Sequence, residues 1–167
     1  TMTASPRVYL DLLKVMVENF LFHGFRRVIL VDGHGGNIVP SQQALFEVRQ
    51  KYRQRDDLLL LSATYWTLGS KPRDVHSAFL QSQMGHACEW ETSMMLRIRP
   101  ELVGDYKAAP TVAQEEPFAP AHRAWITKDR STIGHIGHPA AATAEKGEIL
   151  CQLFSNDLVN YLNRLIS

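Results

Sequence analysis

The sequence has few cysteines, almost no net charge and no long apolar run. Two cysteines, Cys88 and Cys151, are too few for a disulfide framework, which indicates buried thiols in a reducing compartment and favours the cytoplasm. A formal net charge of +1 gives no reason to expect nucleic acid or a membrane surface as a partner. No apolar run approaches the roughly 18 residues of a membrane-spanning helix, and no signal peptide is visible.

Internal repeats and low-complexity segments are also missing, and the chain starts at Thr1 instead of an initiator methionine. That start is compatible with a processed, trimmed or incomplete chain. The length of 167 residues fits one domain. A composition that is 45% hydrophobic and 21% charged is typical of a globular protein, so a packed core is expected.

The most informative stretch is residues 28–37, which read Val-Ile-Leu-Val-Asp-Gly-His-Gly-Gly-Asn. Its four apolar residues predict a strand buried on both faces, and its three glycines suit a tight turn. Open α/β sheets bind ligands at the carboxyl ends of their strands, so Asp32 and His34 are candidates for holding a metal or substrate. The alternative is a structural turn in which Asn37 caps the next helix and His34 is solvated. These residues alone do not decide between the two.

Helical and strand patterns alternate along the chain. Helices are predicted over residues 6–23, 39–53, 85–97 and 140–165, and a second buried strand over residues 58–66. In the first helix the residues at apolar helical spacing are Val8, Leu12, Val15, Met16 and Phe20. Helix, strand, helix, strand in that order predicts a parallel sheet covered by helices. Residues 67–83 are expected to form an irregular loop, and residues 104–132 a lid or an oligomer contact.

The first turns of the helix predicted over residues 85–97 are crowded with functional groups. His86 can act as a general acid or base near neutral pH, and Glu91 as a metal ligand or a second acid or base. On an ideal helix these two side chains are offset by about 140°, so they need not touch, although both can face one pocket at the helix start. The simple interpretation of Glu89 is that it complements the helix dipole.

Three segments together resemble the creatininase family of creatinine amidohydrolases and their relatives. They are the Asp-Gly-His-Gly-Gly-Asn turn at 32–37, Gly-His-Ala-Cys-Glu-Trp-Glu-Thr-Ser at 85–93, and the glycine turn at 134–139 with Ala-Thr-Ala-Glu-Lys-Gly at 142–147. Each motif is modest alone, but the three in the family's order are specific. The resemblance implies a three-layer α/β/α sandwich with a mostly parallel sheet.

The resemblance also implies an activity and the residues that carry it. Family members are metal-dependent hydrolases of non-peptide C–N bonds, usually in small cyclic or formyl amides, with two divalent metals (zinc, manganese or iron). By position, His34 matches a metal-ligand histidine, His86 a histidine that transfers a proton, and Glu91 a glutamate that ligates metal or assists the reaction. The substrate pocket would be lined by Asp32, Gly35, Gly36, Asn37 and Trp66, although Trp66 could equally pack in the core. A homo-oligomer is expected, as in the family.

Two departures from the family pattern matter. In true creatininases the first motif is similar to Asn-Gly-His-x-Glu-Asn, and its glutamate is a metal ligand. Gly36 occupies the position of that glutamate in this chain. This points to the wider family instead of creatininase proper. The family's earliest motif, a Glu-x-His pair followed by an Asp, also has no counterpart. The expectation is therefore one creatininase-like domain over residues 1–167, incomplete at its N-terminus, which corresponds to the C-terminal two thirds of a member.

Three hypotheses follow for function. The first is a creatininase-type amidohydrolase, and the second is a non-catalytic family remnant that acts as a binding or structural subunit. A nucleotide-binding domain is the weakest, because the glycine turn lacks Gly-x-Gly-x-x-Gly spacing. We expect His34, His86 and Glu91 to converge on one pocket, and the Gly134, Gly137 and Pro139 turn to approach it. His135 and His138 are expected to be exposed and not to ligate metal. The isolated chain is expected to bind metal weakly, to hydrolyse little and to self-associate.

Overall fold

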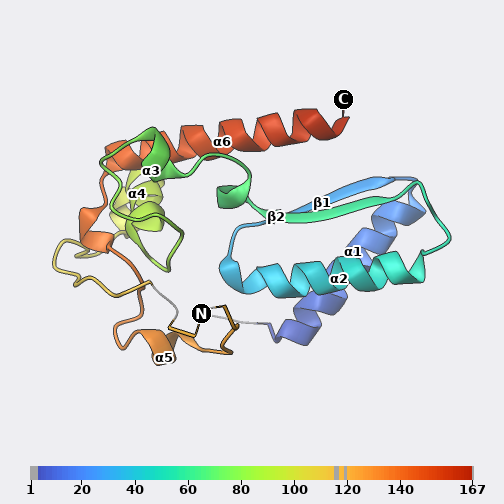
Figure 1. Ribbon diagram of the computed structural model, residues 1–167, viewed down its shortest axis with the longest axis horizontal. Helices are drawn as coiled ribbons and strands as arrows, with labels where there is room; N and C mark the ends of the chain where they lie inside the picture. Colours follow the sequence, from blue (N-terminus) through green and yellow to red (C-terminus); the bar gives the residue numbers. More distant parts are fainter. Residues whose placement is uncertain (1–3, 115–116, 119, 167) are drawn as a thin grey trace. The chain divides into compact units, whose positions relative to one another are not determined.

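The chain folds into two compact units, Thr1–Leu68 and Gly69–Ser167, in a computed structural model that describes residues 4–114, 117–118 and 120–166 (Figure 1). The prediction of one domain over residues 1–167 stays a prediction beside this division. Among the described residues, no helix is long and apolar enough to cross a bilayer.

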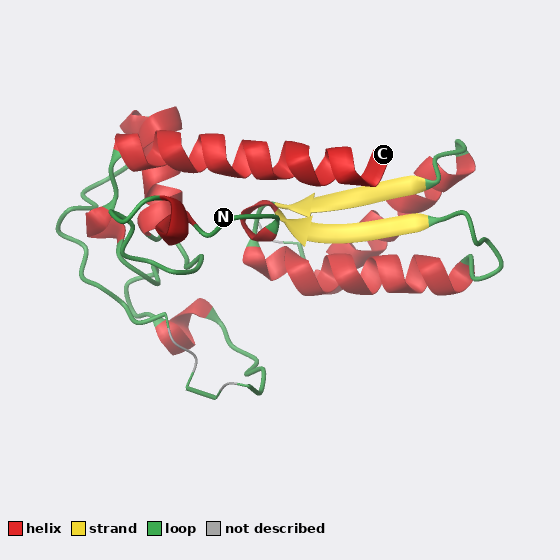
Figure 2. Cartoon of the chain, turned by 45° about the horizontal axis from the view of Figure 1, so that its top comes forward, coloured by secondary structure: helices red, strands yellow, loops and turns green. Residues whose placement is uncertain are grey.

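The first unit is a parallel pair of strands packed with two helices. Its elements, in order, are α1 (Pro6–Phe22), β1 (Arg27–Asp32), the 3-10 turn η1 (Gly35–Asn37), α2 (Ile38–Lys51), β2 (Leu59–Thr64) and η2 (Tyr65–Thr67). The strands run in the same direction, with Val28 opposite Leu60 and Asp32 opposite Thr64 (Figure 2). The predicted order of elements and the parallel pairing are therefore confirmed.

Local sequence explains where α1 begins and ends. The Ser5 hydroxyl accepts a hydrogen bond from the Val8 amide at 3.3 Å, and Pro6 occupies the first turn, where no amide donor is needed. Gly24 follows the helix with φ of +90°, a left-handed conformation that favours glycine. The Phe25 amide then donates to the Phe20 carbonyl at 3.0 Å, which closes the helix end.

The face of α1 that packs in the core differs from the one that the apolar spacing singled out. The buried residues are Leu10, Leu13, Val17 and Leu21, which pack with Val28, Ala44, Leu45 and Val48 of β1 and α2. The residues identified from spacing are instead exposed: Val8, Leu12, Val15, Met16 and Phe20. The helix is apolar on two faces, and periodicity does not say which of them the sheet will cover.

The second unit is built around a pair of helices. Its elements are α3 (Pro72–Val75), α4 (Glu89–Ile98), η3 (Pro100–Leu102), α5 (Thr127–Arg130), η4 (Pro139–Ala141) and α6 (Ala144–Ile166). α4 and α6 pack closely: a Cβ on Gly147 would lie 2.1 Å from the Ser93 carbonyl oxygen, so only glycine fits. The Trp90 and Phe154 rings add to this contact, with centroids 6.0 Å apart.

Both long helices of this unit start four residues later than predicted. Residues 85–88 and 134–143 have a different role, because they carry backbone bridges between loops and a 3-10 turn. Short helical turns also form within the segments predicted to be irregular, α3 in residues 67–83 and α5 in residues 104–132. Such single turns are too short to give a periodic signal.

Candidate functional site

The glycine turn after β1 places His34 beyond the strand end. His34 is exposed, with extended backbone, directly before η1. Asp32, the last residue of β1, is only 5% exposed, and its Oδ1 accepts a hydrogen bond of 2.7 Å from the Ser41 hydroxyl. Asp32 therefore ties the turn to the first turn of α2, whereas His34 is presented to solvent.

Gly36 leaves room for the His34 ring. A Cβ at Gly36 would lie 2.9 Å from Nε2 of His34, whereas Gly33 and Gly35 have nothing within 4 Å of such an atom. The imidazole thus lies against the backbone of Gly36. Asn37 occupies the N-cap position of α2, and its side chain makes no capping hydrogen bond there. The alternative interpretation, in which the Asn37 side chain caps α2, is therefore not supported by a capping hydrogen bond.

Trp66 lies at the same edge of the parallel pair. β1 and β2 end together, because Asp32 is paired with Thr64, and η2 follows at once. The Trp66 side chain is half-buried and packs edge-on against the Tyr65 ring, with centroids 4.8 Å apart. The predicted pocket residues of the first unit therefore gather at one sheet edge.

In the second unit, His86 is held by backbone pairing and does not belong to a helix. Its amide donates to the Ile136 carbonyl at 2.9 Å, and its carbonyl accepts from the Ile136 amide at 2.7 Å. Gly85 is required beside this bridge, because a Cβ there would lie 2.1 Å from the Ile136 oxygen. The expected helical offset between His86 and Glu91 therefore does not apply, since α4 starts only at Glu89.

Glu91 bends back toward the segment that carries His86. Its Oε2 accepts a hydrogen bond of 2.5 Å from the Ala87 amide, and the Thr92 hydroxyl donates to the Ala87 carbonyl at 3.3 Å. Ala87 has φ of +44°, a strained left-handed conformation for a residue with a Cβ. A carboxylate accepts several hydrogen bonds, so the bond to Ala87 leaves Glu91 capacity for a proton or a ligand.

The glycine turn at 134–139 contacts His86 through Ile136, and whether it lines a shared pocket stays a prediction. Gly137 also pairs with Val112, with N–O distances of 2.9 and 3.0 Å, so three loop segments lie side by side. Within them the two histidines are not exposed, which corrects the expectation. His135 is 9% exposed with Nε2 2.6 Å from the Pro110 carbonyl, and half-buried His138 places Nδ1 3.1 Å from the Thr111 hydroxyl. That neither ligates metal stays a prediction.

The predicted site residues are divided between the two compact units. Asp32, His34 and the other turn residues belong to the first, and His86 and Glu91 belong to the second. Their convergence on one pocket therefore stays a prediction. Over residues 4–114, 117–118 and 120–166, no group of three or more His, Cys, Asp or Glu side chains is arranged to hold a metal ion.

Sequence reasoning missed a buried polar group beside the predicted site. Glu89 is fully buried and forms an ion pair with Lys146 of α6, and Gln81, which is 1% exposed, donates its amide to the Glu89 carboxylate. In the sequence, only the presence of Glu89 pointed to this group, and its place near a helix start was already explained by the helix dipole. The partner lies 57 residues away in sequence, so no local pattern reports the contact.

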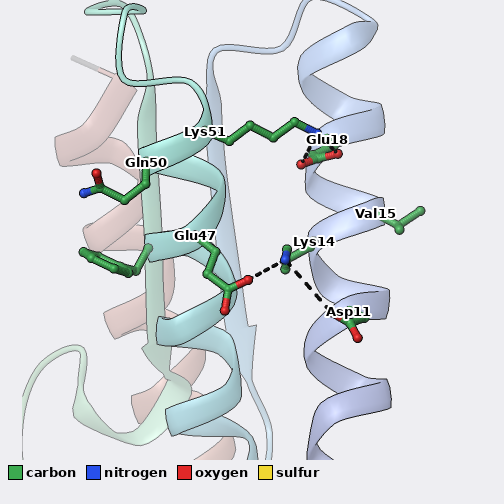
Figure 3. Close-up of a pocket in the computed structure, with 8 residues that line it drawn as sticks. Asp11, Lys14, Val15, Glu18, Glu47, Gln50 and Lys51 are labelled. Atoms are coloured by element: carbon green, nitrogen blue, oxygen red, sulfur yellow. Dashed lines mark hydrogen bonds and ion pairs between the residues drawn. The ribbon is translucent and has the colours of Figure 1, made fainter.

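A groove between α1 and α2 is a separate feature of the first unit (Figure 3). It is lined largely by paired charges: Lys14 binds Glu47, and Lys51 binds Glu18 at 2.9 Å. The hydrogen bonds from Lys14 and Gln43 lower the pKa of the Glu47 carboxyl. Since its charges are already matched and none of the predicted site residues lines it, this groove is not the candidate site.

Comparison with known proteins shows to which family this chain belongs. The family described as creatinine amidohydrolase (Creatininase) matches residues 1–162. The chain is 30% identical over 139 residues to a mycofactocin precursor peptide peptidase of Mycobacterium ulcerans (strain Agy99), covering 83% of this chain and 48% of that protein. It is 26% identical over 149 residues to the creatinine amidohydrolase of Pseudomonas putida, covering 83% and 55%. The chain thus spans about half the length of these curated relatives.

Solved structures show the same fold. A crystal structure of creatininase superposes with a TM-score of 0.79 at 20% identity, over 98% of this chain and 65% of that one. A putative creatinine amidohydrolase from Bacteroides fragilis gives 0.63 at 26% identity, over 93% and 61%. Other similar structures carry the names "Creatininase Mn" and a "Zn-Zn type" mutant. The predicted α/β fold with a parallel sheet and covering helices is therefore confirmed.

Proposed function

Because the chain belongs to the creatininase family, we propose that it acts as a metal-dependent amidohydrolase of small, non-peptide amides, cyclic or formyl. The observation that carries the proposal is the arrangement around α4. A glycine-flanked histidine, His86, is fixed by a two-way backbone bridge, and Glu91 is turned back onto the next residue. General acid–base work needs such fixed geometry, because a proton moves efficiently only over hydrogen-bond distance.

In this proposal each residue has a definite task. His86 delivers a proton to the leaving nitrogen, and Glu91 either ligates metal or assists that transfer. His34 is the second ligand from this chain. A bound divalent ion, zinc, manganese or iron, would supply an activated water and polarise the amide carbonyl. Catalytic zinc usually takes about three protein ligands, and the described residues do not assemble such a set. The described residues therefore supply only part of a donor set for the ion.

A second candidate is hydrolysis of a peptide bond. It is favoured by the similarity to the mycofactocin precursor peptide peptidase. The C–N bond broken is again an amide, so the same acid–base pair would serve. The two candidates differ only in whether the substrate is a small amide or a peptide.

The test measures turnover and metal content separately. The purified chain is loaded with zinc or manganese and offered a cyclic amide, an N-formyl amide and a short peptide. His86→Gln should lower kcat by about 100-fold or more with unchanged metal content, and His34→Gln should lower metal content. His23→Gln, at an exposed residue after α1, is the matched control. Full turnover in His86→Gln would overturn the proposal. Metal-loaded chain without any turnover would favour the non-catalytic subunit.

We also propose that the chain forms a homo-oligomer in the cytoplasm, with neither nucleic acid nor a membrane as a partner. The apolar residues that α1 leaves exposed support self-association, because contiguous exposed apolar surface is uncommon on monomers. Light scattering at several protein concentrations tests this. A mass of one chain throughout would contradict it.

A further inference from the structure

A buried polar cluster joins four segments of the second unit around the base of α4. The Glu89 carboxylate, which is fully buried, accepts hydrogen bonds from the Leu80 and Gln81 amides, both at 2.9 Å from Oε2. Lys146 of α6 donates to Glu89 and also to the Ala141 carbonyl at 2.8 Å. The cluster thus links residues 80–81, the first turn of α4, η4 and the first turn of α6.

Gln81 is the member of this cluster that reaches the glycine turn. Its Oε1 accepts hydrogen bonds from the Glu89 amide and from the His138 amide, both at 2.8 Å, while Nε2 donates to the Gln83 carbonyl at 3.2 Å. Gly137 makes space for this amide, because a Cβ there would lie 2.5 Å from Oε1 of Gln81. One buried side-chain oxygen therefore fixes both the start of α4 and the turn at 137–138.

The turn that Gln81 holds is also the turn that holds His86. Ile136 exchanges two backbone hydrogen bonds with His86, and Ile136 is the second residue before His138. On its other side, His86 is followed by Ala87, which the Glu91 carboxylate clamps. Two contacts hold the segment that carries His86: the backbone bridge to Ile136 and the hydrogen bond from Ala87 to Glu91. Gln81 is linked to the first through the glycine turn, and to the second through the start of α4, since Glu91 is in the first turn of that helix.

From this connection we infer that Gln81 is a positioning residue, which orients His86 toward Glu91 by holding the glycine turn and the start of α4 together. The inference rests on the proposed function in that His86 and Glu91 are its acid–base pair. Gln81 itself touches neither substrate nor metal in this role. An unpaired buried amide is costly, so removal of the Oε1 acceptor should loosen the two amides that it serves and, through them, the bridge at His86.

The test compares two substitutions two residues apart. Gln81→Met keeps the length of the side chain and removes the acceptor. Gln83→Met makes the same chemical change at an exposed side chain and is the matched control. Amide hydrogen exchange is followed at His86 and Ile136, which donate into the bridge, and at Leu150 and Phe154 in the middle of α6. In Gln81→Met the bridge amides should exchange about tenfold faster or more, while the α6 amides keep their rates.

A second variant keeps the inference testable if Gln81→Met unfolds the unit. Gln81→Glu retains an acceptor oxygen at the same place, and burial beside the Glu89 carboxylate favours the neutral form of the new carboxyl group. Its bridge amides should therefore exchange more slowly than those of Gln81→Met. Where turnover is measurable, Gln81→Met should lower kcat with little change in KM. Unchanged exchange at His86, or an equal acceleration at every amide of the second unit, would overturn the inference. Because exchange needs no substrate, this result stands apart from whether the chain hydrolyses amides.

Discussion

Gly36 shows at the scale of single residues how an absent side chain shapes the candidate site. The His34 ring occupies the space that a Cβ would need, so the choice of glycine and the position of the imidazole are coupled. The glycine at position 36 therefore determines where the His34 ring can lie.

We expect Gly36→Ala to move the His34 ring. The new methyl group would come within 2.9 Å of Nε2, which forces the imidazole to rotate away. The ring chemical shifts of His34 should change, and zinc bound per chain should fall. Gly35→Ala, where nothing lies within 4 Å, is the control and should leave both unchanged. Equal spectra for the two variants would contradict the assigned contact.

Removal of Lys146 should be the more damaging of two charge deletions in the second unit. Lys146→Met leaves the fully buried Glu89 carboxylate without its cation, which typically costs about 3–5 kcal/mol of unfolding free energy. Arg97→Met breaks the ion pair with Glu148, whose side chains are 52% and 43% exposed, and should cost less than about 1 kcal/mol. Urea denaturation measures both losses. Similar values would show that Glu89 gains solvent or another partner.

At the scale of elements, α1 and α2 are joined by a core on one side and by charges on the other. Leu13, Val17 and Leu21 are buried, while Lys14 and Lys51 bridge the two helices through Glu47 and Glu18. Burial of those apolar side chains contributes more than exposed ion pairs do, because solvent screens the charges. The ion pairs therefore mainly determine which polar faces of α1 and α2 lie against each other.

The Lys14–Glu47 pair predicts a pH dependence with a definite sign. The hydrogen bond from Lys14 lowers the pKa of Glu47, so the stabilisation is present above the ordinary range of a glutamate and is lost as the pH falls through the lowered pKa. In Lys14→Met the titration of the Glu47 carboxyl, followed by its carbon chemical shift, should move to higher pH. Gln50→Met, in the same groove, is the control. An unmoved titration in Lys14→Met would show that the pair is absent in solution.

At the scale of the whole molecule, the predicted site residues come from both compact units. His34 belongs to Thr1–Leu68, and His86 and Glu91 belong to Gly69–Ser167. The motifs occur in the order of the family, and the fold is that of creatininase, which is why we expect them to serve one pocket.

Paramagnetic broadening by Mn²⁺ tests that convergence directly. One shared ion near His34 and Glu91 should broaden the ring signals of His34 and His86 at the same Mn²⁺ concentration. In His34→Gln the broadening at His86 should weaken, because one ligand is lost. His23, which lies after α1, provides the control signal and should stay sharp. Broadening of His34 without any effect at His86 would mean that the two units do not share a site.

The sequence by itself determined the elements of the first unit and their parallel order. Residues 28–31 and 58–61 are unbroken apolar runs, and Ser5, Pro6 and Gly24 act on their own neighbours, so these signals are local. The family resemblance also follows from sequence alone, since it depends on residues 32–37, 85–93 and 142–147, and the match over residues 1–162 confirms it.

Tertiary structure alone decided four features. It selected which apolar face of α1 is buried, because the choice depends on where the sheet lies. It started α4 at Glu89, since His86 pairs with Ile136, which is 50 residues away in the chain. It also buried Glu89 with Lys146 and Gln81, and it took His135 and His138 out of solvent. In each case the deciding partner is distant in the chain, and local patterns in a sequence carry no information about such contacts.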